Sequence, residues 1–248
     1  MESAPTFEAI GNRSSQRRFS QKEVSDSLLF ELLELSNRAP SGYNLQPWHF
    51  VLVRDQEVKT LLSHVALDQK QILEAYATVV FVADPKAWKD SYPTVLRDSI
   101  AQGIMDEKYA NFSRNNVSML FRTGPVGLFG LMKKITLPLR RFKEPTPQLI
   151  ASKTEAESYV KSHTMLAAAT FMIAATGAGL ATCPIEGFDE YRLKRLLVIP
   201  KHMCVPMIIS VGYAIEGDEQ VKSYRTPLVK KLSADLFPNK LEKLKNKG

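Results

Sequence analysis

The apolar residues near the N-terminus follow a helical pattern. From Ser25 to Arg38, leucines recur in steps of three and four, as on one face of a helix, at Leu28, Leu29, Leu32, Leu33 and Leu35. Pro40 ends this pattern, because proline and the residue before it disfavour helical backbone. A second helix is expected over Asp55–Ala66.

Three runs of β-branched and aromatic residues predict strands over Trp48–Arg54, Thr78–Ala83 and Val205–Tyr213. The last run is apolar enough to be covered on both faces. Helical stretches between strands imply a layered α+β or α/β domain with one main sheet. Because no linker-like tract divides the chain, we expect one domain over residues 1–248.

The stretch Met165–Ile185 contains no charged residue and, with Thr164, is long enough by length alone to be a transmembrane candidate. Its composition favours a soluble helix, because Ala, Thr and Gly dominate and aromatic and basic anchors are missing at both ends. We therefore predict a helix that is covered on every side. The sequence Gly177-Ala178-Gly179 is typical of a helix C-terminus.

Composition limits the classes of protein that fit. With 44% hydrophobic and 24% charged residues, the chain can bury a core. Two cysteines form no disulfide scaffold and indicate a reducing compartment, and Met1–Phe7 lacks the pattern of a secretory signal, so we expect a cytoplasmic protein. The four histidines are dispersed, so no metal site is expected.

The net charge of +7 belongs to one segment. Between Tyr109 and Lys143 there is no acidic residue and there are seven basic ones: Arg114, Arg122, Lys133, Lys134, Arg140, Arg141 and Lys143. Without these seven, the 33 basic residues fall to 26, which equals the 26 acidic residues. The rest of the chain is therefore neutral, and no nucleic-acid partner is expected.

The segment Arg13–Phe19 carries candidate anion-binding residues. If it is extended, Arg13, Ser15 and Arg17 share a face and span about 13 Å. Guanidinium and hydroxyl groups suit phosphate and ribityl oxygens. On residue type alone, a solvated basic arm explains the segment better.

Three more stretches complete a set of motifs: Ala39–Trp48 (APSGYNLQPW), Thr182–Asp189 (TCPIEGFD) and Lys222–Pro227 (KSYRTP). Together with Arg13–Phe19 (RSSQRRF), they resemble the cofactor motifs of the FMN-dependent nitroreductase family, in the same order. The resemblance covers roughly residues 7–108 and 155–232. Residues between these ranges, an excursion at about 109–150, match no motif of the family.

The resemblance implies an α+β nitroreductase-like fold, in which helices wrap a central mixed or antiparallel sheet and two chains form an intertwined homodimer with FMN at the interface. It implies an oxidoreductase that uses NAD(P)H to reduce nitroaromatics, quinones or similar electron-poor acceptors in a ping-pong order. Two alternatives stay open. One is other flavin chemistry on this fold, such as reductive dehalogenation or flavin fragmentation, and the other is a non-catalytic flavin-binding or membrane-surface protein.

By resemblance, the FMN phosphate is held by residues near both ends of the chain, namely Arg13, Ser14, Ser15, Lys222 and Arg225. Arg17 is placed near N1 and O2 of the flavin ring, where a cation stabilises the reduced form. Ser14 departs from the family, whose members often carry Arg or His at this position.

The remaining cofactor residues also follow from the resemblance. The turn that reaches the partner subunit's flavin supplies Pro40, Ser41 and Asn44. The loop that faces the ring supplies Pro184, Ile185, Glu186 and Gly187, the last two through backbone N–H groups at N5 and O4. Gln69 matches a contact to the pyrimidine edge, with Gln71 close enough to substitute. No protein nucleophile is implied.

The segment Phe112–Lys143 alternates apolar clusters with basic residues. We predict a lid over the flavin mouth, in which Phe121, Leu128 and Phe129 line the substrate pocket. Weak contact with a membrane surface is the alternative, because Lys and Arg beside Phe, Leu and Met suit an anionic interface.

Overall fold

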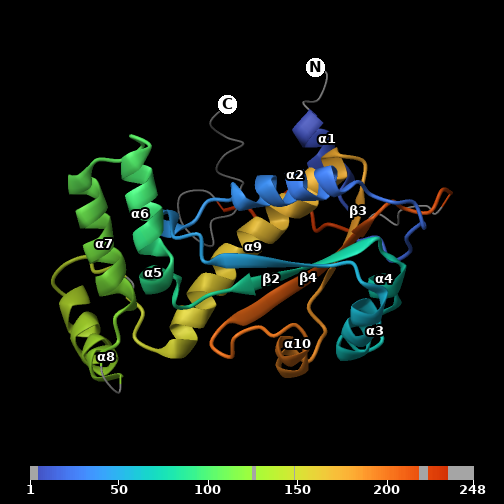
Figure 1. Ribbon diagram of the computed structural model, residues 1–248. Coiled ribbons are helices and arrows are strands. Elements are labelled where there is room, and N and C mark those ends of the chain that lie inside the picture. Colours follow the sequence, from blue (N-terminus) through green and yellow to red (C-terminus); the bar gives the residue numbers. More distant parts are fainter. Residues whose placement is uncertain (1–4, 125–126, 148, 218–222, 234–248) are drawn as a thin grey trace, which may run out of the picture. The chain divides into compact units, whose positions relative to one another are not determined.

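The computed structural model describes residues 5–124, 127–147, 149–217 and 223–233. The chain forms two compact units, Met1–Asp218 and Glu219–Gly248. The first unit holds the sheet and the helices labelled in Figure 1. In the second unit, the described residues include one short 3-10 turn, Leu228–Lys230.

The first unit is built on a four-stranded sheet in which every neighbouring pair is antiparallel. The strands follow the order β1-β2-β4-β3, with the bounds β1 (Trp48–Val53), β2 (Ala77–Ala83), β4 (Cys204–Gly212) and β3 (Ala181–Ile185). All seven residues of β2 are buried, because the strand has a neighbour on each side and helices on both faces. The prediction of an α+β fold around a central sheet is confirmed.

Helices cover both faces of the sheet (Figure 1). One face packs against α2 (Asp26–Asn37) and α9 (Lys153–Gly177), and the other packs against α3 (Gln56–Val65), α4 (Lys70–Glu74) and α10 (Glu190–Leu196). On the α9 face, the ring of Phe171 meets the ring of Phe81 from β2 edge to face, with centroids 5.9 Å apart. On the other face, Leu62, Ile72 and Leu193 pack onto the sheet. The observed bounds of α2 agree closely with the helix that the leucine pattern predicted.

The uncharged run Met165–Ile185 is divided between a helix and a strand. The helix α9 ends at Gly177, and β3 begins at Ala181. Gly179 has a φ of +74°, a left-handed conformation that glycine adopts without strain, so the chain turns there. The predicted helix end at Gly177–Gly179 is confirmed, whereas the strand after it was not predicted. Among the described residues, no helix has both the length and the apolar character needed to cross a bilayer.

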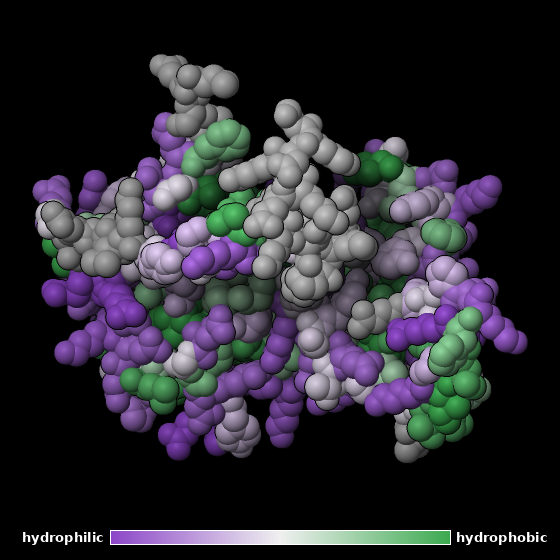
Figure 2. Space-filling model, turned by 180° about the vertical axis from the view of Figure 1, so that it is seen from behind, coloured by the Kyte–Doolittle hydropathy of each residue, from purple (hydrophilic) through white to green (hydrophobic). Residues whose placement is uncertain are grey.

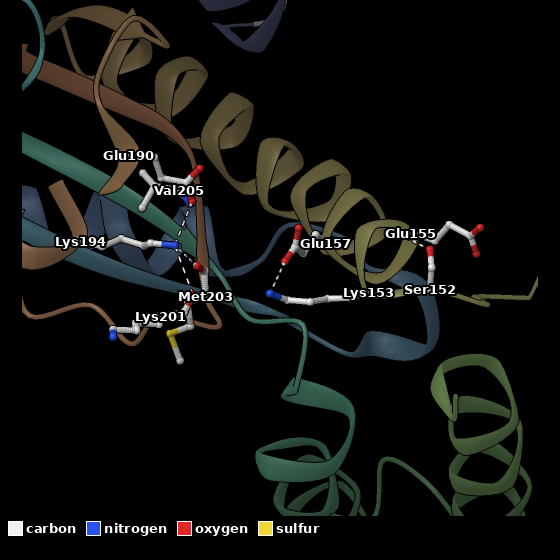
Figure 3. Close-up of polar contacts among 9 residues, drawn as sticks. All are labelled: Ser152, Lys153, Glu155, Glu157, Glu190, Lys194, Lys201, Met203 and Val205. Carbon is white, nitrogen blue, oxygen red and sulfur yellow. Dashed lines mark hydrogen bonds and ion pairs between the residues drawn. The ribbon is translucent and has the colours of Figure 1, made fainter. Parts of the chain in front are cut away.

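The start of α9 is fixed by its own side chains (Figure 3). The Oγ of Ser152 accepts a hydrogen bond from the backbone N–H of Glu155 at 3.2 Å, and the carboxylate of Glu155 accepts one from the N–H of Ala151 at 2.6 Å. The arrangement is similar to a capping box, except that the carboxylate receives the N–H of Ala151, the residue before the N-cap Ser152. It places the helix start 12 residues before the uncharged run.

Polar contacts also attach α10 to the sheet (Figure 3). The Nζ of Lys194 donates to the carbonyl of Met203 at 3.0 Å and lies 3.5 Å from the carboxylate of Glu190. The same carboxylate accepts a hydrogen bond from the N–H of Val205 at 3.0 Å. These bonds join α10 to the start of β4.

Four helices lie beside the sheet (Figure 1), α5 (Ala87–Asp90), α6 (Tyr92–Ala101), α7 (Glu107–Phe121) and α8 (Leu128–Arg141), and the last two make up most of the excursion at about 109–150. Their small core includes the buried side chains of Tyr92 and Phe121. Phe121 stacks on Trp88 and meets Tyr159 of α9 edge to face, with ring centroids 6.1 and 5.3 Å away. The excursion is therefore anchored to α9.

Candidate active site

The residues 13–20, here called the N-terminal arm, lie along the edge strand β3. The arm follows α1 (Pro5–Asn12), forms a parallel bridge between Ser15 and Thr182, and donates a hydrogen bond from the N–H of Gln16 to the carbonyl of Thr182 at 2.9 Å. Gln16 is buried, whereas Ser15 and Arg17 are exposed. The arm is paired with the sheet at Ser15, and the buried Gln16 anchors it there.

The arm presents two cations that have no carboxylate partner. Within the described residues, neither Arg13 nor Arg17 forms an ion pair, whereas Arg18 pairs with Glu74 at 3.1 Å. Burial raises the pKa of the Cys183 thiol, and the nearby charge of Arg17 partly opposes this rise. Arg17 therefore lies close to Cys183 of β3, and among the described residues neither guanidinium group is engaged by a carboxylate, the partner that would compete with an anion.

The turn after β3 is held by a glutamine at the start of α4. Glu186 and Gly187 are exposed. The Nε2 of Gln69 donates to the carbonyl of Gly187 at 2.8 Å, and the Oε1 of Gln69 accepts from the Nε2 of Gln71 at 2.6 Å. The structure thus brings Gln69 to the turn that carries Glu186, and it occupies both ends of the Gln69 carboxamide with protein partners.

The turn Pro40–Asn44 has unusual backbone geometry. Tyr43 and Asn44 have φ angles of +56° and +55°, which are uncommon for residues other than glycine and occur often at functional sites. The Oγ of Ser41 accepts a hydrogen bond from the N–H of Gln46 at 2.9 Å. Gly42 lies so close to the hydroxyl of Tyr159 that a Cβ would not fit. The turn is therefore fixed against α9.

The two predicted flavin-facing loops belong to opposite edges of the sheet. The turn Pro40–Asn44 precedes β1, and the turn of Glu186 and Gly187 follows β3. Because two strands lie between β1 and β3, the edges are separated by three strand spacings, about 14 Å. A single chain therefore presents the two loops as separate surfaces.

The remaining predicted residues are spread over several places. Phe121 is buried in the core of the excursion, Leu128 is exposed, and Phe129 lines a groove of about 480 Å³ between α7 and α8. Lys222 lies outside the described residues. Arg225 belongs to the second unit, where its guanidinium donates to the carbonyl of Tyr224 at 3.2 Å.

Sequence reasoning missed Thr182 as the residue that receives the arm. Its Oγ1 is the buried side-chain polar atom that, among the described residues, has no hydrogen-bond partner. An unsatisfied buried hydroxyl costs about 1–3 kcal/mol. The motif that begins at Thr182 was visible in the sequence, but its pairing with Ser15 joins segments far apart in the chain.

A group of potential metal ligands lies elsewhere. Within the described residues, Asp84, Asp90 and His202 each offer one atom within 4.8 Å of the others. The Oδ1 of the buried Asp84 accepts a hydrogen bond from the N–H of Lys86 at 2.8 Å and lies 3.4 Å from the Nε2 of His202. These contacts give the group a structural explanation.

Comparison with known proteins extends this picture. The chain has an α+β fold whose edge strand β3 lies against an arm with two cations that form no ion pair among the described residues. Residues 10–213 match the family model described as the nitroreductase family, and the chain belongs to that family, as predicted. The chain is 30% identical to a protein from Thermus thermophilus named NADH dehydrogenase over 87% of this chain and 89% of the relative.

Two solved structures show the same fold. The ydfN protein of Bacillus subtilis has a TM-score of 0.74 and 23% identity, with 92% of this chain and 97% of that chain covered. A structure from Exiguobacterium sibiricum, solved in complex with FMN, has a TM-score of 0.70 and 19% identity, with 94% and 99% covered. At this level of identity, the likeness establishes the shared fold.

Proposed function

We propose that this chain is an FMN-dependent oxidoreductase that uses NAD(P)H to reduce electron-poor acceptors, such as quinones and nitroaromatics, and that it acts as a homodimer. Membership of the nitroreductase family supports the proposal, as does the FMN bound to a structure of the same fold. The observation that carries it is the pair of guanidinium groups of Arg13 and Arg17, which have no carboxylate partner in the part of the chain that the structure describes, on an arm that lies against β3.

The residues present fit FMN. A phosphate needs fixed cations and hydroxyl donors, which Arg13 and Ser15 offer on a segment that Gln16 anchors. Arg225 is proposed as a second phosphate cation, because it matches a family motif near the end of the chain.

The turn after β3 fits the ring of the cofactor. FMN, when bound, supplies the hydride chemistry of the reaction. The exposed N–H groups of Glu186 and Gly187 are proposed to donate hydrogen bonds to the ring, and Arg17 to place positive charge beside it. Gln69 holds the carbonyl of Gly187, in the peptide that follows these N–H groups, and thereby restrains the backbone of the turn. The protein thus contributes orientation and electrostatics rather than a nucleophile.

Two observations support a dimer. The C-terminal half of α9, from Met165 to Gly177, is uncharged, and its Leu166 is 44% exposed in the single chain. A second copy would bury this surface, which is a favourable use of apolar surface. In addition, Pro40–Asn44 and the turn of Glu186 lie at opposite edges of the sheet. Two chains are therefore proposed to form each site, one providing the first turn and the other providing the second.

Substrate selection is proposed to involve Phe129, which lines the groove between α7 and α8 beside the guanidinium of Arg122, 5.3 Å from its ring centroid. Phe121 and Leu128 were predicted to share this role. Phe121 also stacks on Trp88 and meets Tyr159 edge to face, so a substitution there would disturb this core as well.

Steady-state kinetics test the proposal. Purified protein with added FMN should oxidise NADH or NADPH in the presence of menadione or nitrofurazone, with parallel double-reciprocal plots typical of ping-pong order. Arg17→Ala should reduce kcat/KM more than Arg18→Ala, since Arg18 is occupied by Glu74. Absence of turnover with any acceptor, despite bound FMN, would favour a flavin carrier. Anaerobic formation of products other than the reduced acceptor would favour a different flavin reaction.

A further inference from the structure

The helix α8 exposes a row of apolar side chains. They recur in steps of three and four and thus share one face of the helix, and each is 57–64% exposed: Leu128, Leu131, Ile135 and Leu139. Phe142, just after the helix, continues the row and is 90% exposed. Figure 2 shows hydrophobic surface gathered at the corner of the first unit that α8 occupies. Exposed apolar patches of this kind mark interaction sites.

The opposite face of α8 is attached to the protein, which fixes the orientation of the row. The Nζ of Lys133 donates to the carbonyls of Leu120, Arg122 and Ile150 at 3.1, 2.8 and 2.8 Å. Gly130 is buried so closely against the carbonyl of Ala151 that a side chain would not fit. These contacts prevent α8 from turning its apolar row inward. The lid interpretation explains Phe129, which lines the groove, but leaves the outer row without a partner.

Cations flank the apolar row. Among the described residues, Lys134, Arg141 and Lys143 have no carboxylate partner. Arg140 does, because it pairs with Glu144 at 2.6 Å. Long basic side chains beside an apolar face can extend their charged ends to lipid phosphates while the apolar groups enter the bilayer surface. The surface therefore combines apolar area and positive charge along one helix.

We propose that α8 is an interfacial helix that binds the surface of an anionic membrane, with Leu131 and Ile135 in the acyl boundary and Lys134, Arg141 and Lys143 at the phosphates. A second copy is the other occupant that could cover the row. A symmetric contact between two such surfaces would bring like charges together, which opposes association. The uncharged C-terminal half of α9 is better suited to that role. The proposal does not depend on flavin binding.

Co-sedimentation with vesicles tests the proposal. The full chain should bind vesicles of phosphatidylcholine with about 30% phosphatidylserine at low salt, bind pure phosphatidylcholine vesicles more weakly, and dissociate as salt rises. Leu131→Ser combined with Ile135→Ser should weaken binding tenfold or more. Leu61→Ser is the matched control, because Leu61 is similarly exposed but lies on α3. Its binding should equal that of the parent chain.

A charge variant separates the electrostatic contribution to vesicle binding from the apolar contribution. Lys134→Gln with Arg141→Gln and Lys143→Gln should abolish the preference for anionic vesicles and keep the far-ultraviolet circular dichroism of the parent. Failure of the parent to bind anionic vesicles at low salt would overturn the proposal. So would equal binding by the Leu131/Ile135 variant and the Leu61 control. A change from dimer to monomer in the Leu131/Ile135 variant would show that the row is an interface between copies instead.

Discussion

The carboxamide nitrogen of Gln69 lies 2.8 Å from the carbonyl oxygen of Gly187 and donates a hydrogen bond to it. This bond connects the start of α4 with the turn that follows β3. It means that Gln69 contacts the proposed cofactor loop through the peptide of Gly187, and its effect on FMN is expected to include this positioning role.

Replacing Gln69 with Ala should release the Gly187 peptide and weaken FMN binding by about 0.5–1.5 kcal/mol, the net value of one hydrogen bond. Titration of the apoprotein with FMN, followed by flavin fluorescence, measures this change. Gln71→Ala is the control, because Gln71 bonds only to the side chain of Gln69 in this network, and it should have a smaller effect. Equal effects for both variants would argue against the positioning role.

The three proposed cation sites can be compared directly. Arg13→Ala, Arg17→Ala and Arg225→Ala should each weaken FMN binding by about 1.5–3 kcal/mol, the range for hydrogen bonds to charged groups. Arg18→Ala should change FMN binding little, because Arg18 already pairs with Glu74. Retention of FMN during dialysis provides the measurement. If the Arg13 and Arg225 variants both retain FMN as the parent does, the phosphate assignment is wrong.

The dimer proposal predicts that FMN and association are lost together. Leu166→Asp places a charge on the uncharged C-terminal half of α9 and should shift the protein to monomers with little bound flavin. Light scattering coupled to size-exclusion chromatography reports both mass and flavin absorbance. Leu61→Asp, on exposed α3, should remain dimeric. A monomer with full flavin occupancy would contradict two-chain sites.

Substitutions of Lys133 and of its neighbour Lys134 should change the free energy of unfolding by different amounts. Lys133→Met removes a donor to three carbonyls and should lower the free energy of unfolding by about 1.5–3 kcal/mol. Lys134→Met should change it by less than about 0.5 kcal/mol, as is usual for exposed positions. Urea unfolding, followed by circular dichroism, distinguishes the two. Comparable losses in both variants would mean that the three bonds of Lys133 contribute little.

Much of the fold was predictable from local pattern. The leucines of α2 and the β-branched runs of β1, β2 and β4 locate these elements to within about one residue, because one period dominates each run. The strand β3 was missed, because Ala181–Ile185 continues an uncharged run without a change of hydropathy. The glycines before it were the available signal.

The sequence motifs indicated which residues belong to the candidate site, but they did not indicate how the fold brings those residues together. The motifs identified the arm and the turn at Glu186, yet the pairing of Ser15 with Thr182 and the bond from Gln69 to Gly187 join distant segments, which periodicity does not report. The sequence alone also did not show which way the apolar face of α8 points. Its apolar row is visible there, but the three bonds of Lys133 decide that the row faces outward.

The central claim is that the arm and the turn at Glu186 hold FMN without a covalent bond. An absorbance spectrum of the purified protein, repeated on the supernatant after heat denaturation, tests it most directly. The account predicts a flavin band near about 450 nm that passes entirely into the supernatant, with about one FMN per chain after reconstitution. No flavin band, together with no spectral change when FMN is added, would contradict the account.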